Sequence, residues 1–281
     1  MLVARCALVK HLAAEHGDRF VLKGGALLYH VYGTPRVSFI DTDYAEVATR
    51  GAPDPIDVER DVVFEDRESG YSLKTSPDGS WDDKGYIVRA NNLTYTLDDF
   101  RPAHESRSRI NISVSFRRSE RIDTPSQTLY FDPDGLLSDS APFEVTGLTL
   151  EEASAEKILA WCLKEDLGKH FADLAILARD HQAEIDTGRV IELVAEKFQR
   201  EKKAAETRGL YEDLGDPSDL TPLFLDEERM RRLRAEWAGS IGARIWLRPS
   251  EREQARPITD FENVETLVRE FWAEPVAGLS P

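Results

Sequence analysis

The stretch that decides the fold reads Phe20-Val21-Leu22-Lys23-Gly24-Gly25-Ala26-Leu27, and it is followed by Asp41-Thr42-Asp43. The apolar residues at its start predict a short strand, and the two glycines predict a turn into a helix over residues 26–32. A second strand is expected over residues 37–47, with both aspartates inside it. Because alternate residues of a strand lie on the same face, Asp41 and Asp43 are expected to present two carboxylates side by side.

Two carboxylates this close repel each other unless a cation lies between them, and their hard oxygen atoms suit Mg²⁺. An isolated Asp-x-Asp is a weak signal, but the glycine turn beside it lets backbone N–H groups approach a phosphate at a helix N-terminus. The alternative for Gly24 and Gly25 is an ordinary strand-to-helix turn, and the GxxxxGK[ST] pattern of a Walker A loop is absent. A phosphate turn beside a magnesium pair is the minimum needed for nucleotidyl transfer.

The remaining patterns predict an α+β fold in two parts. A helix is expected over residues 2–16, and short strands are expected at 62–64, 86–88, 93–95 and 110–114. Thr149 followed by two glutamates reads as the start of a helix. Helices are then expected over 155–178, 189–199 and 262–272, and a loop over 213–222. We therefore expect a mixed β-sheet domain over residues 1–145 and a helical domain over residues 146–281.

Composition limits the cellular setting and the partners. The chain of 281 residues has only two cysteines, Cys6 and Cys162, which read as core residues in a reducing compartment. No apolar run is long enough to span a membrane and no signal-peptide cleavage site is visible, so we expect a cytoplasmic protein.

The formal net charge of −16 argues against a protein that coats nucleic acid through its overall field. A local basic groove is still compatible with this charge. Two arginine clusters are candidates for it, Arg107, Arg109, Arg117, Arg118 and Arg121, and Arg229, Arg231, Arg232 and Arg234. The alternative is that both clusters belong to solvated faces balanced by neighbouring acidic residues.

A family resemblance is carried by four motifs in the same order. They are residues 20–27, Arg36-Val37-Ser38, Asp41-Thr42-Asp43, and the pair of segments 155–160 (AEKILA) and 169–174 (KHFADL). Together they resemble the AbiEii/AbiGii toxin nucleotidyltransferases and the MenT-type toxins of mycobacterial toxin–antitoxin pairs. The resemblance covers roughly residues 18–178 and implies a nucleotidyltransferase-type sheet followed by helices.

The resemblance also implies roles for individual residues. Asp41 and Asp43 would bind Mg²⁺, and Lys157 would reach the triphosphate of an NTP, which suits a compact ammonium group. Asp173 would activate a hydroxyl or orient Lys157. The residues expected to bind the donor nucleotide are Lys23, Gly24, Gly25, Ser38 and Lys169. Without the resemblance, Lys157 and Asp173 would read as surface residues of helices.

The chain departs from the family pattern at three positions. Ala26 replaces a hydroxyl residue after the glycines, and Ile40 adds one residue between Ser38 and the aspartates, which leaves the strand register and any phosphorylation of Ser38 open. On the strand where a third carboxylate is expected, the residue is Asn111. Its amide oxygen can bind a metal but brings no charge, and Asp98 or Glu105 are possible substitutes.

The function implied is a toxin that transfers nucleotides from an NTP to an acceptor, with release of pyrophosphate. By resemblance, the acceptor is the 3′ end of tRNA, and a cognate antitoxin is a partner. A protein hydroxyl is an alternative acceptor that the acidic surface would not hinder. The rival from another class is a degenerate, non-catalytic module that binds nucleotide or a partner, which Ala26 and Asn111 would favour.

Overall fold

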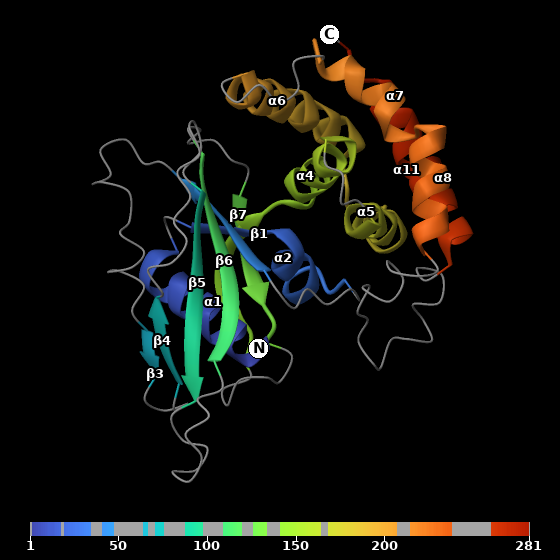
Figure 1. Cartoon of the computed structure of the whole chain (residues 1–281). Helices are drawn as coiled ribbons and strands as arrows, with labels where there is room; N and C mark the ends of the chain where they lie inside the picture. Colours follow the sequence, from blue (N-terminus) through green and yellow to red (C-terminus); the bar gives the residue numbers. More distant parts are fainter. Residues whose placement is uncertain are drawn as a thin grey trace. The chain divides into compact units, whose positions relative to one another are not determined.

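The computed structural model describes residues 2–17, 20–34, 41–47, 64–66, 71–75, 88–97, 109–119, 126–133, 141–163, 168–206, 214–237 and 260–280. The chain divides into two compact units (Figure 1). The first comprises Met1–Gly33 and Ser38–Leu148, and the second comprises Thr34–Val37 and Thr149–Pro281. Each unit is described by itself.

The first unit is built around a mixed sheet. Its described elements are α1 (Leu2–His16), β1 (Phe20–Lys23), α2 (Gly24–His30), β2 (Asp41–Val47), β3 (Phe64–Asp66), β4 (Tyr71–Thr75), β5 (Val88–Leu97), β6 (Arg109–Ser119), β7 (Ser126–Phe131) and β8 (Phe143–Leu148). The eight described strands follow the order β3-β4-β5-β6-β2-β1-β8-β7. The β2–β6 and β1–β8 pairs are parallel, and the other neighbours are antiparallel.

One face of the central strands is apolar, and helix α1 covers it. Val9 and Leu12 of α1 are buried and line a small gap together with Phe20, Leu22 and Tyr44 of the sheet. Phe20 and Tyr44 meet edge to face, with ring centroids 6.0 Å apart. Lys23 and Asp43 are paired across β1 and β2 and lie one residue out of step with these apolar positions, so they fall on the other face.

The same alternation continues into β6. Thr42 pairs with Val114 and Tyr44 pairs with Phe116, whereas Asp41 pairs with Ser113. The apolar positions of β6 therefore share the face of α1, and its polar positions, except Arg118, share the face of the two aspartates. The hydrophobic pattern of each strand thus agrees with the register in which it pairs.

Two strands predicted at residues 86–88 and 93–95 are a single element. Strand β5 runs without a break from Val88 to Leu97, and residues 88–96 all pair with β6. The prediction of two strands was wrong because Asn91 and Asn92 look like a turn in sequence. Continuous pairing with a long neighbour overrides their weak strand propensity. Residues 62, 63, 86 and 87 lie outside the described residues.

The second unit is helical. Its described elements are α4 (Leu150–Leu163), α5 (Gly168–Asp180), α6 (Thr187–Glu206), η1 (Pro217–Asp219), α7 (Leu220–Phe224), α8 (Glu227–Glu236) and α11 (Phe261–Ala277). With the mixed sheet of the first unit, these helices confirm the predicted α+β fold class. None of the helices in the described ranges is long and apolar enough to cross a membrane.

Aromatic side chains join the helices into one core. Trp161 of α4 lies against Phe171 of α5, with ring centroids 4.6 Å apart, and its Nε1 donates to the Phe224 carbonyl at 2.7 Å. Trp272 of α11 is fully buried and donates to the Leu174 carbonyl at 3.0 Å. Both indoles therefore bury their rings while their N–H groups remain hydrogen-bonded, as buried tryptophans require. Trp237 is buried in the same core, and Trp246 lies outside the described residues.

The expected loop over residues 213–222 was only partly correct. The chain forms a 3₁₀ turn at Pro217–Asp219 and continues directly into α7. Asp216 accepts a hydrogen bond from the Ser218 backbone N–H, and Asp219 accepts hydrogen bonds from the backbone N–H groups of Gly215 and Asp216. The Asp-Pro-Ser run is therefore a capping box with proline in the first turn, a helix start that resembles loop composition in sequence.

Replacement of Thr149 by alanine should lower the free energy of unfolding by about 1 kcal/mol. Thr149 Oγ1 accepts the Glu152 backbone N–H at 3.2 Å and so caps α4, as predicted. Urea denaturation measures the change. The matched control is Thr266→Ala, since the hydroxyl of Thr266 bonds a carbonyl inside α11 and caps nothing. An equal loss in both variants would show that the cap contributes no stability.

Candidate functional site

The glycine turn and Asp43 form one local structure. Gly24 follows β1 directly and has φ +70°, a left-handed conformation that L side chains rarely adopt. A Cβ placed on Gly24 would collide with Asp43 Oδ2, so the carboxylate of Asp43 lies against the bare α-carbon of Gly24. Lys23, paired with Asp43 across the strands, is 9% exposed. The predicted strand–glycine–helix arrangement is therefore present, with Gly25 as the second residue of α2.

The neighbours of the aspartates on β6 are hydroxyl residues. Asp41 pairs with Ser113 and Asp43 pairs with Ser115, whereas Asn111 lies beyond the end of the pairing with β2. Sequence reasoning missed these two serines because only strand register reveals which residue lies beside which. The side chain of Asp41, all of Ser38, and the substitutes Asp98 and Glu105 lie outside what the structure describes.

The donor set fits a magnesium ion that shares its ligands with a substrate. Two carboxylates on one face are typical protein ligands of Mg²⁺, which keeps waters and substrate phosphates at its other positions. Among the described residues, no three His, Cys, Asp or Glu side chains are grouped to hold a metal. The carboxylate of Asp43 also occupies the space that a side chain at Gly24 would need. Two protein carboxylates would leave the remaining positions of such an ion to water and substrate phosphates.

The predicted residues of the helical unit are paired with each other. Lys157 Nζ of α4 lies 2.6 Å from Asp173 Oδ2 of α5, and the two side chains are 10% and 2% exposed. The interpretation of Lys157 and Asp173 as surface residues is therefore wrong. Isolated charges buried to this degree would be very costly, and the short ion pair offsets that cost. Asp173 is placed to orient the ammonium group of Lys157. Lys169, in the first turn of α5, is exposed.

A second buried ion pair holds α4 from another helix. Lys197 Nζ of α6 lies 2.5 Å from Glu152 Oε1, whose side chain is fully buried, and 3.2 Å from Glu156 Oε1. Glu152 reads in sequence only as an acidic residue in the first turn of a helix, so its burial could not be foreseen. Helix α4 is therefore tied to both α5 and α6 through charged groups.

Arg229, one of the candidates for a basic groove, has a structural role. Its guanidinium lies 4.3 Å from the centroid of the Trp161 ring and donates to the carbonyls of Trp161 and Cys162 at the end of α4. Burial lowers the pKa of Arg229, while burial raises the pKa of the Cys162 thiol to about 12. Arg229 thus satisfies the last carbonyls of α4, and Cys162 is a buried neutral thiol, as predicted for a core cysteine.

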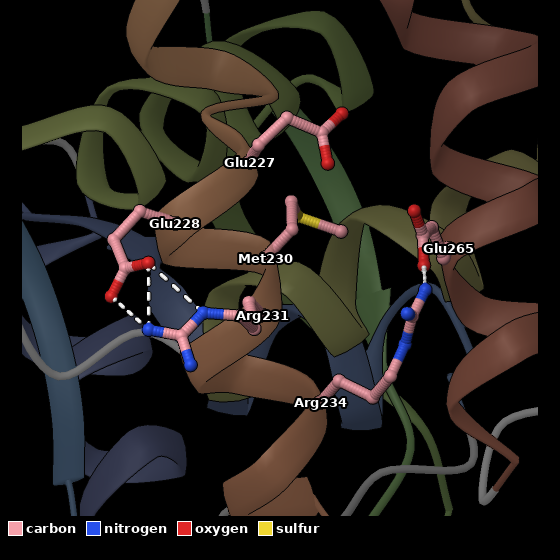
Figure 2. A pocket seen from close by; sticks show the side chains of 6 residues that line it. All are labelled: Glu227, Glu228, Met230, Arg231, Arg234 and Glu265. Atoms are coloured by element: carbon pink, nitrogen blue, oxygen red, sulfur yellow. Dashed lines mark hydrogen bonds and ion pairs between the residues drawn. The ribbon is translucent and has the colours of Figure 1, made fainter.

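The other arginines of this cluster are balanced by glutamates. A groove of about 450 Å³ lies between α8 and α11. Figure 2 shows that Met230 and charged side chains line it. Arg231 bonds Glu228 at 2.7 Å, and Arg234 bonds Glu265 at 2.6 Å. Burial opposes ionisation of Glu265, but hydrogen bonds from Arg269 and Arg234 outweigh it and lower the pKa of Glu265. This confirms the interpretation of these residues as a charge-balanced face. Of the first cluster, Arg107 and Arg121 lie outside the described residues.

Comparison with known proteins gives the class of the chain. The family model of the nucleotidyl transferase AbiEii toxin, Type IV TA system, matches residues 7–255, which is most of the chain. The chain therefore belongs to the AbiEii family of nucleotidyl transferase toxins, and the resemblance seen in its motifs is confirmed. A search of curated proteins found no match.

Replacement of Gly24 by alanine should destabilise the first unit more than replacement of Gly33. Both glycines have similar positive φ angles, +70° and +67°, so both variants carry a strain of about 1–2 kcal/mol. Only at Gly24 would the new Cβ displace Asp43, since nothing lies within 4 Å of a Cβ at Gly33. We expect an additional loss of about 1–3 kcal/mol for Gly24→Ala, measured by urea denaturation. Equal losses would mean that Asp43 moves aside freely.

Removal of one partner of the buried ion pair should destabilise the protein strongly. Asp173→Leu or Lys157→Met each leaves one uncompensated charge and should cost about 3–5 kcal/mol. The double variant Lys157→Met/Asp173→Leu should recover much of that loss, and thermal unfolding of all three measures it. The control is Arg231→Gln at the exposed Arg231–Glu228 pair, which should leave stability unchanged. Additive losses in the double variant would contradict a direct coupling of Lys157 and Asp173.

Proposed function

We propose that the chain is a Mg²⁺-dependent enzyme that transfers a nucleotide from an NTP to the 3′ end of tRNA, and that it acts in the cytoplasm as the toxin partner of an antitoxin. In this reaction the 3′ hydroxyl attacks the α-phosphorus of the NTP. A new phosphodiester bond forms, the α–β bridge breaks, and pyrophosphate leaves. The tRNA modified in this way no longer serves translation.

The packing of Asp43 against Gly24 is the observation that carries this proposal. Asp41 and Asp43 would hold the metal ion, which when bound neutralises phosphate oxygens during the displacement. Gly24 and Gly25 begin α2, where backbone N–H groups have no helical partner and are available to a phosphate. Lys23 and Ser38 are the further donor-nucleotide residues of this part of the chain. Family membership supports the reaction class.

Lys157 and Asp173 serve the same reaction in this proposal. Lys157 would neutralise the triphosphate, for which a point charge on a flexible stem is suited. Asp173 would orient the ammonium group of Lys157, and the 2.6 Å ion pair supports this role over activation of a hydroxyl. The exposed Lys169 would contribute a further positive charge to nucleotide binding.

Incubation of purified protein with Mg²⁺, total tRNA and each α-³²P-labelled NTP in turn tests the proposal. We expect label in tRNA with at least one NTP, and a loss of at least 10³-fold in Asp43→Asn, because electrostatic stabilisation by metal ligands dominates phosphoryl transfer. Asp180→Asn is the matched control, since Asp180 bonds Arg179 at an exposed position and should label tRNA as the wild type does.

The other outcomes separate the alternatives. Label that enters polypeptide instead of RNA would move the acceptor to a protein hydroxyl. NTP binding without transfer to any acceptor would contradict catalysis and favour the degenerate binding module, which Ala26 and Asn111 allow. Equal activity in Asp43→Asn and the wild type would exclude the aspartate pair as the site.

A further inference from the structure

The sheet face that carries Asp41 and Asp43 continues across three further strands. Strand β6 pairs with β2 on one side and with β5 on the other, and β5 pairs with β4. Asp41 lies opposite Ser113, and Ser113 lies opposite Asn92. Thr94, two residues after Asn92 and therefore on the same face of β5, lies opposite Lys74, so the register defines one continuous face. From β2 to β4 this face spans three strand spacings, about 14 Å.

Hydroxyl and amide residues occupy most positions of this face. On β6 they include Asn111, Ser113 and Ser115, and on β5 they are Asn92, Thr94 and Thr96. Residues of this kind donate hydrogen bonds to phosphate and sugar oxygens in protein–nucleic acid interfaces. A solvated sheet face would also be polar, so polarity alone does not identify a ligand. The charges at the remaining positions provide the second observation.

All the charged residues on this face in β4, β5 and β6 are cations. They are Lys74, Arg109 and Arg117, and no aspartate or glutamate occupies a face position in these three described strands. The whole chain has a net charge of −16, so such a local excess of positive charge is not expected from composition. The charge of this face is complementary to a polyanion.

The aromatic residues of the same strands fall on the opposite face. Tyr71, Tyr95 and Phe116 are one residue out of step with the polar positions and share the register of the apolar face. The polar face therefore offers contacts for phosphate and sugar but no aromatic platform on which bases could stack. A ligand held there would be recognised by its backbone, with little dependence on sequence.

We propose that this polar face of β4, β5 and β6 binds the sugar–phosphate backbone of the acceptor RNA and leads its 3′ end towards Asp41 and Asp43. The inference rests on the proposed function in taking an RNA as the acceptor. In this proposal Arg109 and Arg117 contact the RNA. Arg118 and Arg89, at positions on the apolar face of the same strands, do not contact it.

Fluorescence anisotropy with 5′-labelled total tRNA tests the inference without any turnover. The test variant is Lys74→Gln/Arg109→Gln/Arg117→Gln, and the matched control is Arg89→Gln/Arg118→Gln on the opposite face of β5 and β6. We expect the test variant to bind at least tenfold more weakly than the wild type and the control to bind within twofold of it. The slope of log K against log salt should fall by about 2 in the test variant, about 0.7 per lost contact to single-stranded RNA.

Thermal unfolding of each variant shows whether it is folded. If the triple variant unfolds, the single variants Lys74→Gln and Arg117→Gln replace it, each with an expected loss of slope of about 0.7. Equal weakening by test and control variants, an unchanged slope in the test variant, or no binding of tRNA by the wild type would each overturn the inference.

The failure of this inference and the failure of the proposed function give different results. Asp43→Asn should not weaken the binding of tRNA, because this substitution removes a negative charge and none of the cations of the face. If no NTP labels tRNA but the triple variant still loses tRNA binding while the control does not, the face binds RNA and the proposed transfer is wrong. If tRNA is labelled equally by wild type and triple variant at limiting tRNA, the site is catalytic and the face is not its acceptor surface.

Discussion

A strand can bury only one of its two faces against a single helix, and the first unit depends on that constraint. Helix α1 covers Phe20, Leu22 and Tyr44, so those positions must face it if their apolar area is to leave water. Because side chains alternate, the residues between them are necessarily on the other side. A slip of one residue in β2 would turn both aspartates towards α1 and Tyr44 away from it, so the composition of this strand excludes that register.

The two strands beside β2 extend this constraint to the candidate site. Strand β1 brings Lys23 and Gly24 next to Asp43, and β6 brings Ser113 and Ser115 next to the aspartate pair. The two aspartates thus have a lysine as neighbour on β1 and hydroxyl residues as neighbours on β6, and the charge that a third carboxylate would add is missing from β6. A metal ion at such a site would depend more on substrate phosphates for its remaining ligands.

In the helical unit, helix α4 is the element to which the others are tied. Its Lys157 pairs with α5, its Glu152 pairs with α6, and its last carbonyls accept hydrogen bonds from Arg229. Buried ion pairs add little net stability compared with apolar contacts, but each one penalises any rotation of the helix that would separate the charges. Such pairs therefore define the orientation of α4 more sharply than the aromatic core alone.

The sequence by itself determined that a strand-rich part precedes a helical part, and it determined the glycine turn, the aspartate pair on a strand and the family. These features depend on local periodicity and on residue types at fixed spacing, which a linear chain displays directly. The prediction from sequence was wrong at two places where residues typical of turns have another role. Asn91 and Asn92 lie inside strand β5, and Asp216, Pro217 and Ser218 begin a helical segment. Only tertiary structure decided which residues are neighbours across strands and helices. Three features depend on register and burial, because contacts between distant segments are set by the packing of the whole unit. They are the close approach of Asp43 to Gly24, the ion pair of Lys157 with Asp173, and the placement of Arg117 and Arg118 on opposite faces of the sheet.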